Sequence, residues 1–322
     1  MTPASTTLVD RLRSGDPRAL ARAISTVENR QPGWSELLKA LFPHTGKARV
    51  IGLTGAPGSG KSTLVNQLAK DYRKKQQTVG IIAVDPTSPY TGGAILGDRI
   101  RMQDHHGDPG IYIRSMATRG SLGGLARATA DAATVLDASG RDLVMIETVG
   151  VGQDEVDIVR LADVTIVILV PGMGDDVQTI KAGIMEIADI FVINKSDREG
   201  AERVEREIRA MQSLAARTRN DRWTPPIVKT VATEGIGTQE LAAAIADYEA
   251  YLKKENLVFK KNVENWQERL IEMLRDAMLE KARAQMETDG GSLKRYASEI
   301  AEHKRDPYSL VEEIVGALTK IT

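Results

Sequence analysis

A glycine-rich stretch constrains the fold of this chain more than any other feature, because a strand pattern precedes it and a helix pattern follows it. Its residues fit G-x-x-x-x-G-K-[ST] and are Gly55, Ala56, Pro57, Gly58, Ser59, Gly60, Lys61 and Ser62. The apolar run 49–54 predicts a buried strand, and 63–75 has helical spacing. Together they predict a phosphate-binding loop, in which backbone N–H groups and the positive end of a helix hold phosphate oxygens.

Individual residues of this loop have distinct expected roles. Gly58 and Gly60 allow close approach of a phosphate, because neither carries a Cβ. We expect Lys61 to reach the β- and γ-phosphates, Ser62 to hold Mg²⁺ and Thr63 to donate to the α-phosphate. A glycine-rich turn matched by accident is the alternative, and the flanking strand and helix argue against it. The loop therefore predicts a nucleotide-binding protein.

From residue 47 onward, strand and helix patterns alternate. The candidate strands are 49–54, 78–84, 111–116, 142–147, 163–170, 189–193 and 227–231. They are rich in Val and Ile, which is typical of parallel strands buried on both faces. The pattern predicts an α/β fold of the P-loop NTPase type, with a doubly wound, mostly parallel sheet and helical N- and C-terminal extensions. Ligands of such sheets bind beyond the carboxyl ends of the strands.

The residues after the sixth candidate strand predict the base that is bound. Asn194, Lys195 and Asp197 fit N-K-x-D. A carboxylate at Asp197 can accept from both N1–H and the 2-amino group of guanine, whereas adenine would leave it unpaired. Lys195 would lay its aliphatic stem over the base. We expect the backbone around Ala232 and Thr233 to donate to the guanine carbonyl, so the sequence favours GTP over ATP.

Carboxylates at the ends of other strands are candidates for catalysis. Glu147 and Gly150 occupy the place of the D-x-x-G element, where the carboxylate holds Mg²⁺ or its water and the glycine N–H senses the γ-phosphate. Asp85 is a second candidate, for Mg²⁺ or for orienting the attacking water. Asp98 is a third, although it could equally be a helix cap or the partner of a nearby arginine.

Both ends of the chain have helical patterns outside the nucleotide fold. The expected domains are 1–46, a helical extension; 47–247, the GTPase domain; and 248–322, a helical dimerisation arm. The expected apolar faces are Leu20, Ala23, Ile24 and Val27; Trp34, Leu37, Leu38, Leu41 and Phe42; Val263, Trp266, Leu270, Met273, Leu274, Ala277 and Met278; and Val311, Ile314, Val315 and Leu318. Asp16-Pro17 and Asp306-Pro307 are helix-start signals.

Composition narrows the class of partner. The 322 residues carry a formal net charge of −1, which predicts neither a nucleic-acid nor a membrane-surface partner. The chain has no cysteine, so disulfides and thiolate metal sites are excluded. It also has no apolar run near the ~18 residues of a membrane span. We expect a soluble, cytoplasmic protein.

Five motifs together resemble those of the MeaB/ArgK-type GTPases, the metallochaperones associated with methylmalonyl-CoA mutase. They are residues 55–63, 84–89, 114–120, 147–153 and 194–197. The resemblance extends over essentially the whole chain. It implies a homodimeric GTPase that uses GTP and Mg²⁺ and whose client is an adenosylcobalamin-dependent methylmalonyl-CoA mutase. GTP hydrolysis would gate cofactor delivery and protect the mutase from inactivation.

The resemblance also gives a role to the segment 171–181. It implies an extra switch that contains Asp175 and Asp176, with Lys181 coupling it to the nucleotide; the alternative is an ordinary strand-to-helix connection capped by one of the two aspartates. Two other functions remain open at this point. One is a nickel-inserting GTPase for hydrogenase or urease, which would need a Cys or His cluster. The other is a small-molecule kinase, which would need an acceptor pocket.

Overall fold

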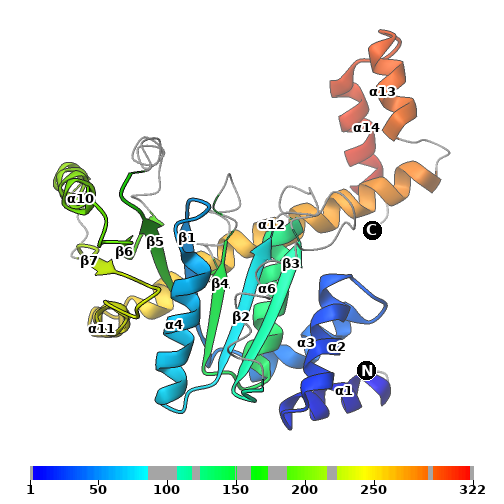
Figure 1. Ribbon diagram of the computed structural model, residues 1–322. Coiled ribbons are helices and arrows are strands. Elements are labelled where there is room, and N and C mark those ends of the chain that lie inside the picture. Colours follow the sequence, from blue (N-terminus) through cyan, green and yellow to red (C-terminus); the bar gives the residue numbers. More distant parts are fainter. Residues whose placement is uncertain are drawn as a thin grey trace. The chain divides into compact units, whose positions relative to one another are not determined.

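The computed structural model describes residues 3–85, 107–117, 124–148, 150, 161–172, 187–215, 223–288 and 293–319. Within them, seven strands form one parallel sheet in the order β3-β2-β4-β1-β5-β6-β7 (Figure 1). The strands are β1 Arg49–Gly55, β2 Val79–Asp85, β3 Ile111–Ala117, β4 Leu143–Glu147, β5 Val164–Leu169, β6 Ile190–Asn194 and β7 Ile227–Thr230. Each expected strand is confirmed to within one residue at either end.

Helices cover both faces of this sheet. Before the sheet lie α1 Pro3–Arg13, α2 Pro17–Glu28, α3 Trp34–Leu41 and the 3-10 turn η1 Phe42–His44; among and after the strands lie α4 Lys61–Lys74, α6 Gly124–Ala138, α10 Ala201–Ala215 and α11 Thr238–Lys254. One face packs against α4 and α11. The other packs against α6 with the N-terminal helices, and against α10. This arrangement confirms the predicted doubly wound α/β fold.

Burial on both faces explains the continuous apolar strands. In β4, Leu143 and Met145 belong to the core beneath α4, while Val144 and Ile146 belong to the core beneath α6. Successive side chains of a strand point to opposite faces, so a strand covered on both sides needs apolar residues at every position.

Aspartates close the amino edge of the sheet. An aspartate directly precedes each of β4, β5 and β6, and its carboxylate accepts from a backbone N–H at the start of the neighbouring strand. The bonds are Thr78 N to Asp142 Oδ2 at 2.7 Å, Val50 N to Asp163 Oδ2 at 2.8 Å and Thr165 N to Asp189 Oδ2 at 2.9 Å. These carboxylates satisfy donors that the parallel ladder leaves open.

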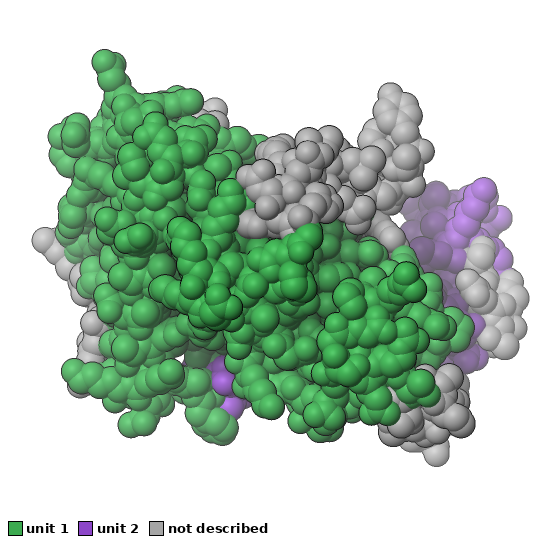
Figure 2. Space-filling view, turned by 60° about the horizontal axis from the view of Figure 1, so that its bottom comes forward, with its two compact units in different colours: residues 1–261 green, residues 262–322 purple. Residues whose placement is uncertain are grey.

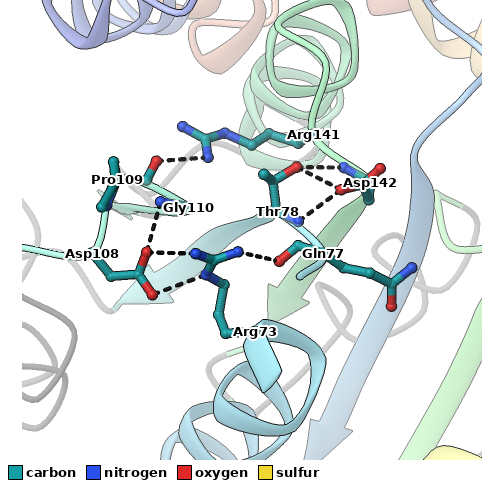
Figure 3. Close-up of polar contacts among 8 residues, drawn as sticks. All are labelled: Arg73, Gln77, Thr78, Asp108, Pro109, Gly110, Arg141 and Asp142. Carbon is teal, nitrogen blue, oxygen red and sulfur yellow. Dashed lines mark hydrogen bonds and ion pairs between the residues drawn. The ribbon is translucent and has the colours of Figure 1, made fainter. Parts of the chain in front are cut away.

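A polar network continues this edge beside β2 and β3 (Figure 3). Arg73, in the last turn of α4, donates to both carboxylate oxygens of Asp108 at 2.9 Å and to the Gln77 carbonyl at 2.9 Å. Arg141 donates to the Pro109 carbonyl at 3.2 Å. Burial and the neighbouring Arg73 lower the pKa of Arg141. The charged groups of this corner therefore join secondary-structure ends to one another.

The N-terminal helices form as expected, with one exception. The Asp16 carboxylate caps α2 by accepting from Arg18 N at 2.8 Å and Ala19 N at 3.2 Å, and an ion pair between Glu28 and Arg114 joins α2 to β3. Phe42 was expected on the inward face of α3, and this prediction is wrong because its side chain is 54% exposed. The Phe42 N–H still donates to the Leu38 carbonyl as in an α-helix, so Phe42 continues the face of Trp34 and Leu38, which are themselves only half-buried.

The chain divides into two compact units, residues 1–261 and 262–322 (Figure 2). The second comprises most of α12 Val258–Thr288, with α13 Leu293–Ala301 and α14 Pro307–Thr319. Its small core contains Met286, Tyr296 and Leu310, against which Ile300 and Ile314 pack. In the part of the chain that is described, no helix combines the length and apolar character that crossing a membrane requires.

The start of α14 is confirmed, but its buried face differs from the expected one. Asp306 Oδ1 accepts from Ser309 N at 2.8 Å. Val311 and Val315, expected to point inward, are 58% and 45% exposed, and the position of Leu318's side chain is not described. Ile314 packs against the core, as expected, and Leu310, which was not expected, is buried beside it. They are spaced i, i+4, so the true stripe lies one residue, about 100°, around the helix from the expected pair.

Candidate nucleotide-binding site

The glycine-rich loop lies at the carboxyl end of β1 and leads into α4, as the sequence predicts. Lys61 is the first residue of α4, and its side chain is buried at 5% exposure. Its Nζ donates to the Gly55 carbonyl at 2.6 Å and to the Ala56 carbonyl at 3.0 Å. Pro57 and Gly58 form the exposed tip of the loop, while Ser59 is buried. The lysine ammonium is thereby held over the loop that would receive phosphates.

Ser62 and Glu147 come together although 85 residues separate them. The Ser62 hydroxyl donates to Glu147 Oε1 at 2.6 Å, and both side chains are buried at 6% and 5% exposure. A hydroxyl and a carboxylate oxygen are hard ligands of the type that Mg²⁺ takes, so this pair fits the expected metal. Thr63, the next residue of α4, is half-buried.

Gly150 lies directly against the phosphate loop. Its φ of 91° is in the left-handed region, and an added Cβ would overlap the carbonyl oxygen of Gly55 and lie 2.6 Å from Lys61 Nζ. Only glycine fits here, because both the conformation and the space exclude a side chain. The position is consistent with a backbone N–H that senses the terminal phosphate.

Several other expected residues have no described side chain. Asp85 is the last residue of β2 and pairs with Ala117 of β3, which places its backbone at the same edge of the sheet. Asp98 and the switch candidates Asp175, Asp176 and Lys181 lie outside the described residues. Their roles stay predictions.

The Asn194 motif follows β6 and contacts the phosphate loop directly. Asn194 Nδ2 donates to the Ser59 carbonyl at 2.8 Å, and Lys195 Nζ donates to the Gly58 carbonyl at 2.7 Å. Lys195 has a φ of 54°, which turns the chain sharply after the strand. Asp197, two residues on, is exposed. The N-K-x-D segment and the glycine-rich loop are therefore one connected structure.

The segment after β7 completes this connection. Asn194 Oδ1 accepts from Thr230 Oγ1 at 3.0 Å and from Ala232 N at 3.1 Å. The Ala232 N–H, which we expected to donate to guanine, thus already donates to Asn194. A bound base would have to share this N–H with the asparagine. Thr233 beside it is exposed. An added Cβ on Gly60 would overlap Asn194 Nδ2, so this glycine makes room for the asparagine as well as for a phosphate.

Sequence reasoning missed three threonines in this region. Thr230 orients Asn194, and the Thr148 hydroxyl donates to Thr54 Oγ1 at 3.0 Å between β1 and the end of β4. All three are buried, at 0–2% exposure. The sequence could have indicated these residues, because each is a hydroxyl side chain in or beside an otherwise apolar strand next to a motif. A buried hydroxyl costs free energy unless it is hydrogen-bonded, so a partner is expected.

The glycine-rich loop and the N-K-x-D motif meet at the carboxyl edge of one parallel sheet, and this arrangement is that of a P-loop GTPase. Comparison with known proteins agrees: residues 20–287 match the family model described as Methylmalonyl Co-A mutase-associated GTPase MeaB. This chain belongs to that family.

Individual relatives support the assignment. A Pyrococcus abyssi protein named as a GTPase is 48% identical over 314 residues, which cover 96% of each chain. The GTPase ArgK of Escherichia coli is 38% identical over 250 residues, 76% of each chain. A crystal structure of a protein named LAO/AO transport system kinase superposes with a TM-score of 0.72 at 26% identity, covering 99% of each chain.

Proposed function

We propose that this GTPase hydrolyses GTP to GDP and phosphate with Mg²⁺ held by Ser62 and Glu147. The observation that carries the proposal is the buried 2.6 Å bond between these two side chains. When bound, the ion would neutralise charge on the phosphates. Asp85 is a second proposed ligand, or the residue that orients the attacking water, since its strand ends at the same edge.

The remaining roles follow from the loop geometry. Lys61, whose Nζ donates to the Gly55 and Ala56 carbonyls of the loop, would exchange these bonds for bonds to the β- and γ-phosphate oxygens of a bound nucleotide. Gly150 would donate its N–H to the γ-phosphate. The segments 55–63, 147–150 and 194–197 contain no arginine that could stabilise the transition state, which favours slow intrinsic hydrolysis accelerated by a partner.

Replacing Asp197 with Asn tests the proposed base specificity. The amide can donate to the 2-carbonyl of xanthine where the carboxylate accepted from guanine. We expect Asp197→Asn to weaken GTP binding by at least about tenfold and to prefer xanthosine triphosphate. Titration calorimetry with both nucleotides, with wild-type protein as the control, measures this. Unchanged GTP affinity would mean that the base is read elsewhere.

The proposed client is an adenosylcobalamin-dependent methylmalonyl-CoA mutase, with GTP hydrolysis in the cytoplasm gating cofactor delivery and protecting the mutase. Support comes from the family description and from a mouse relative named methylmalonic aciduria type A homolog, mitochondrial, 35% identical over 263 residues, which cover 75% of this chain and 63% of its own. A nickel-inserting role is disfavoured, because the chain has no cysteine and only four histidines.

The client can be tested with nucleotide specificity as an internal control. We expect added mutase to accelerate GTP hydrolysis by the wild-type protein, and to accelerate xanthosine triphosphate hydrolysis by Asp197→Asn. If the mutase accelerates neither GTP hydrolysis by the wild type nor xanthosine triphosphate hydrolysis by Asp197→Asn, the client assignment is contradicted. Phosphate release without any acceptor distinguishes hydrolysis from small-molecule kinase activity, the alternative that the name of the similar crystallised protein suggests.

We also propose that the protein is a homodimer that pairs through α12. Its large apolar side chains are exposed along one side, among them Phe259 at 79%, Leu270 at 51% and Leu274 at 61%. A stripe of this length is characteristic of an interaction site. Light scattering after chromatography should give a dimer for the wild type and for Glu272→Gln on the opposite side, and a monomer for Leu270→Glu/Leu274→Glu. A dimer of the double variant would contradict the proposal.

A further inference from the structure

The end of β4 is joined to the phosphate loop at consecutive residues. The Glu147 carboxylate accepts from Ser62, and Thr148 N donates to the Leu53 carbonyl at 3.0 Å. Gly150 then packs against Gly55. Between these contacts lies the hydroxyl pair in which Thr148 donates to Thr54 Oγ1 at 3.0 Å.

This hydroxyl pair is unusual in its surroundings. Thr54 and Thr148 are 1% and 2% exposed, and the buried side chains beside them on the same face of the sheet are Ile146 of β4 and Val167 of β5, the register partner of Thr54. Valine has the same shape as threonine and would fill the same space without a polar group to satisfy. Among the residues that the structure describes, each of these hydroxyls bonds to the other, so removal of one would take this bond from its partner and the two threonines depend on each other.

The position of the pair connects two groups with proposed roles. Thr54 directly precedes Gly55, the first residue of the loop, and Thr148 lies between Glu147 and the 149–150 segment. A shift of Thr148 relative to Thr54 would move both the carboxylate at Ser62 and the glycine at Gly55. Displacement of reacting groups by about 1 Å can cost on the order of 100-fold in rate.

We propose that Thr54 and Thr148 are positioning residues for GTP hydrolysis, whose hydroxyl bridge holds Glu147 and Gly150 in register with the phosphate loop. Neither threonine touches the nucleotide in this proposal. Because Gly150 is proposed to donate its N–H to the γ-phosphate, loss of the bridge that positions it should affect GTP more than GDP. The inference rests on the proposed roles of Glu147 and Gly150.

Three variants test the bridge. Thr148→Val removes one hydroxyl at constant shape, Thr148→Ser keeps the hydroxyl, and Thr54→Val/Thr148→Val removes both. We expect Thr148→Val to lower kcat about tenfold and to reduce the preference for a non-hydrolysable GTP analogue over GDP about fivefold, measured by fluorescent-nucleotide titration. Thr148→Ser should retain kcat and the nucleotide preference.

The double variant separates positioning from folding. Two apolar groups of matching shape leave no unsatisfied hydroxyl, so its thermal stability should return to that of the wild type. Its kcat and analogue preference should stay low, because the register-fixing bond is still missing. Full recovery of kcat and of the preference would overturn the proposal, as would a folded Thr148→Val with wild-type values.

Glu147→Gln makes a failure of this inference distinguishable from a failure of the proposed function. If the Mg²⁺ dependence of analogue binding is the same in Glu147→Gln as in the wild type, the metal assignment fails, and the positioning inference fails with it. If Glu147→Gln loses that dependence while Thr148→Val behaves as the wild type, only the inference about the threonines is overturned.

Discussion

The amino edge and the carboxyl edge of the sheet carry similar polar and charged side chains, but these side chains have different roles at the two edges. At the amino edge, Asp142, Asp163 and Asp189 accept from backbone N–H groups of neighbouring strands, and Arg73 pairs with Asp108 (Figure 3). At the carboxyl edge, aspartate, glutamate and lysine side chains belong to the proposed nucleotide site, and the asparagine and threonines connect its loops.

Geometry explains the division. Parallel strands all end at the same edge, and the loops that follow them are free to converge on a ligand. The strand starts at the other edge carry N–H groups that need acceptors, and a preceding aspartate supplies one. A charged residue therefore has a different role at each edge. Four predictions test this difference.

The largest expected effect comes from two glycines with similar backbone conformations. Gly150 has φ 91° and its Cβ would overlap the loop, whereas Gly140, near the amino edge, has φ 83° and open space around it. Gly150→Ala should lower single-turnover GTP hydrolysis at least about 100-fold. Gly140→Ala should cost only about 1–2 kcal/mol in stability and leave hydrolysis unchanged. Hydrolysis by Gly150→Ala at the wild-type rate would contradict the expected difference between these two glycines.

The second comparison uses the two carboxylates at opposite ends of β4. Glu147→Ala should reduce turnover by about tenfold or more while nucleotide-base preference survives, because the Asn194 motif is untouched. Asp142→Ala should leave turnover unchanged and lower the free energy of unfolding by about 1–3 kcal/mol, because Thr78 loses its acceptor. GTP hydrolysis and denaturant unfolding are measured on both variants. Slow turnover in Asp142→Ala with normal turnover in Glu147→Ala would contradict the assignment of function to the carboxyl edge and stability to the amino edge.

A third comparison concerns arginine. Arg73 makes a two-pronged contact with Asp108 at 22% side-chain exposure, whereas Arg203 pairs with Glu207 at 78%. Arg73→Ala should lower the free energy of unfolding by about 1.5–3 kcal/mol without changing GTP affinity. Arg203→Ala, the control, should change it by less than about 0.5 kcal/mol. A change in GTP affinity for Arg73→Ala would show that the amino edge influences the site.

The smallest expected effect is a pH dependence with opposite signs for two aspartates. The backbone bond from Thr78 lowers the pKa of Asp142, so its stabilisation is present above the unfolded-state pKa and lost as pH falls through the lower folded value. Burial raises the pKa of Asp163, so the folded state loses stability as pH rises through the raised value.

Asparagine substitutions measure these signs. Asp142→Asn should destabilise at pH 7 by about 1 kcal/mol, with the difference from wild type shrinking below about pH 4. Asp163→Asn keeps an acceptor for Val50 N and should be neutral or slightly stabilising at pH 7. Equal destabilisation of both variants at pH 7 would contradict the assigned pKa directions.

Local patterns in the sequence were enough to predict much of this protein. Apolar runs predicted the buried strands, Asp16 and Asp306 marked the starts of their helices, and the loop at Gly55 and the motif at Asn194 indicated the class and the base. Helical faces were less secure: Phe42 at the end of α3 is exposed, and in α14 the expected Ile314 is covered together with Leu310, whereas Val311 and Val315 are exposed. A period of 3.6 locates a face only approximately, and the neighbouring helix selects which residues it covers.

Sequence by itself therefore determined the fold class, the order of the strands along the chain and the residue types at each strand end. Tertiary structure alone decided the pairings across the site, since their partners are far apart in the chain: Ser62 with Glu147 at 85 residues, Thr54 with Thr148 at 94 and Ser59 with Asn194 at 135. A motif encodes the chemistry of its own few residues. Which distant group completes that chemistry depends on strand order and register in the sheet, because these bring the carboxyl ends of β1, β4 and β6 together.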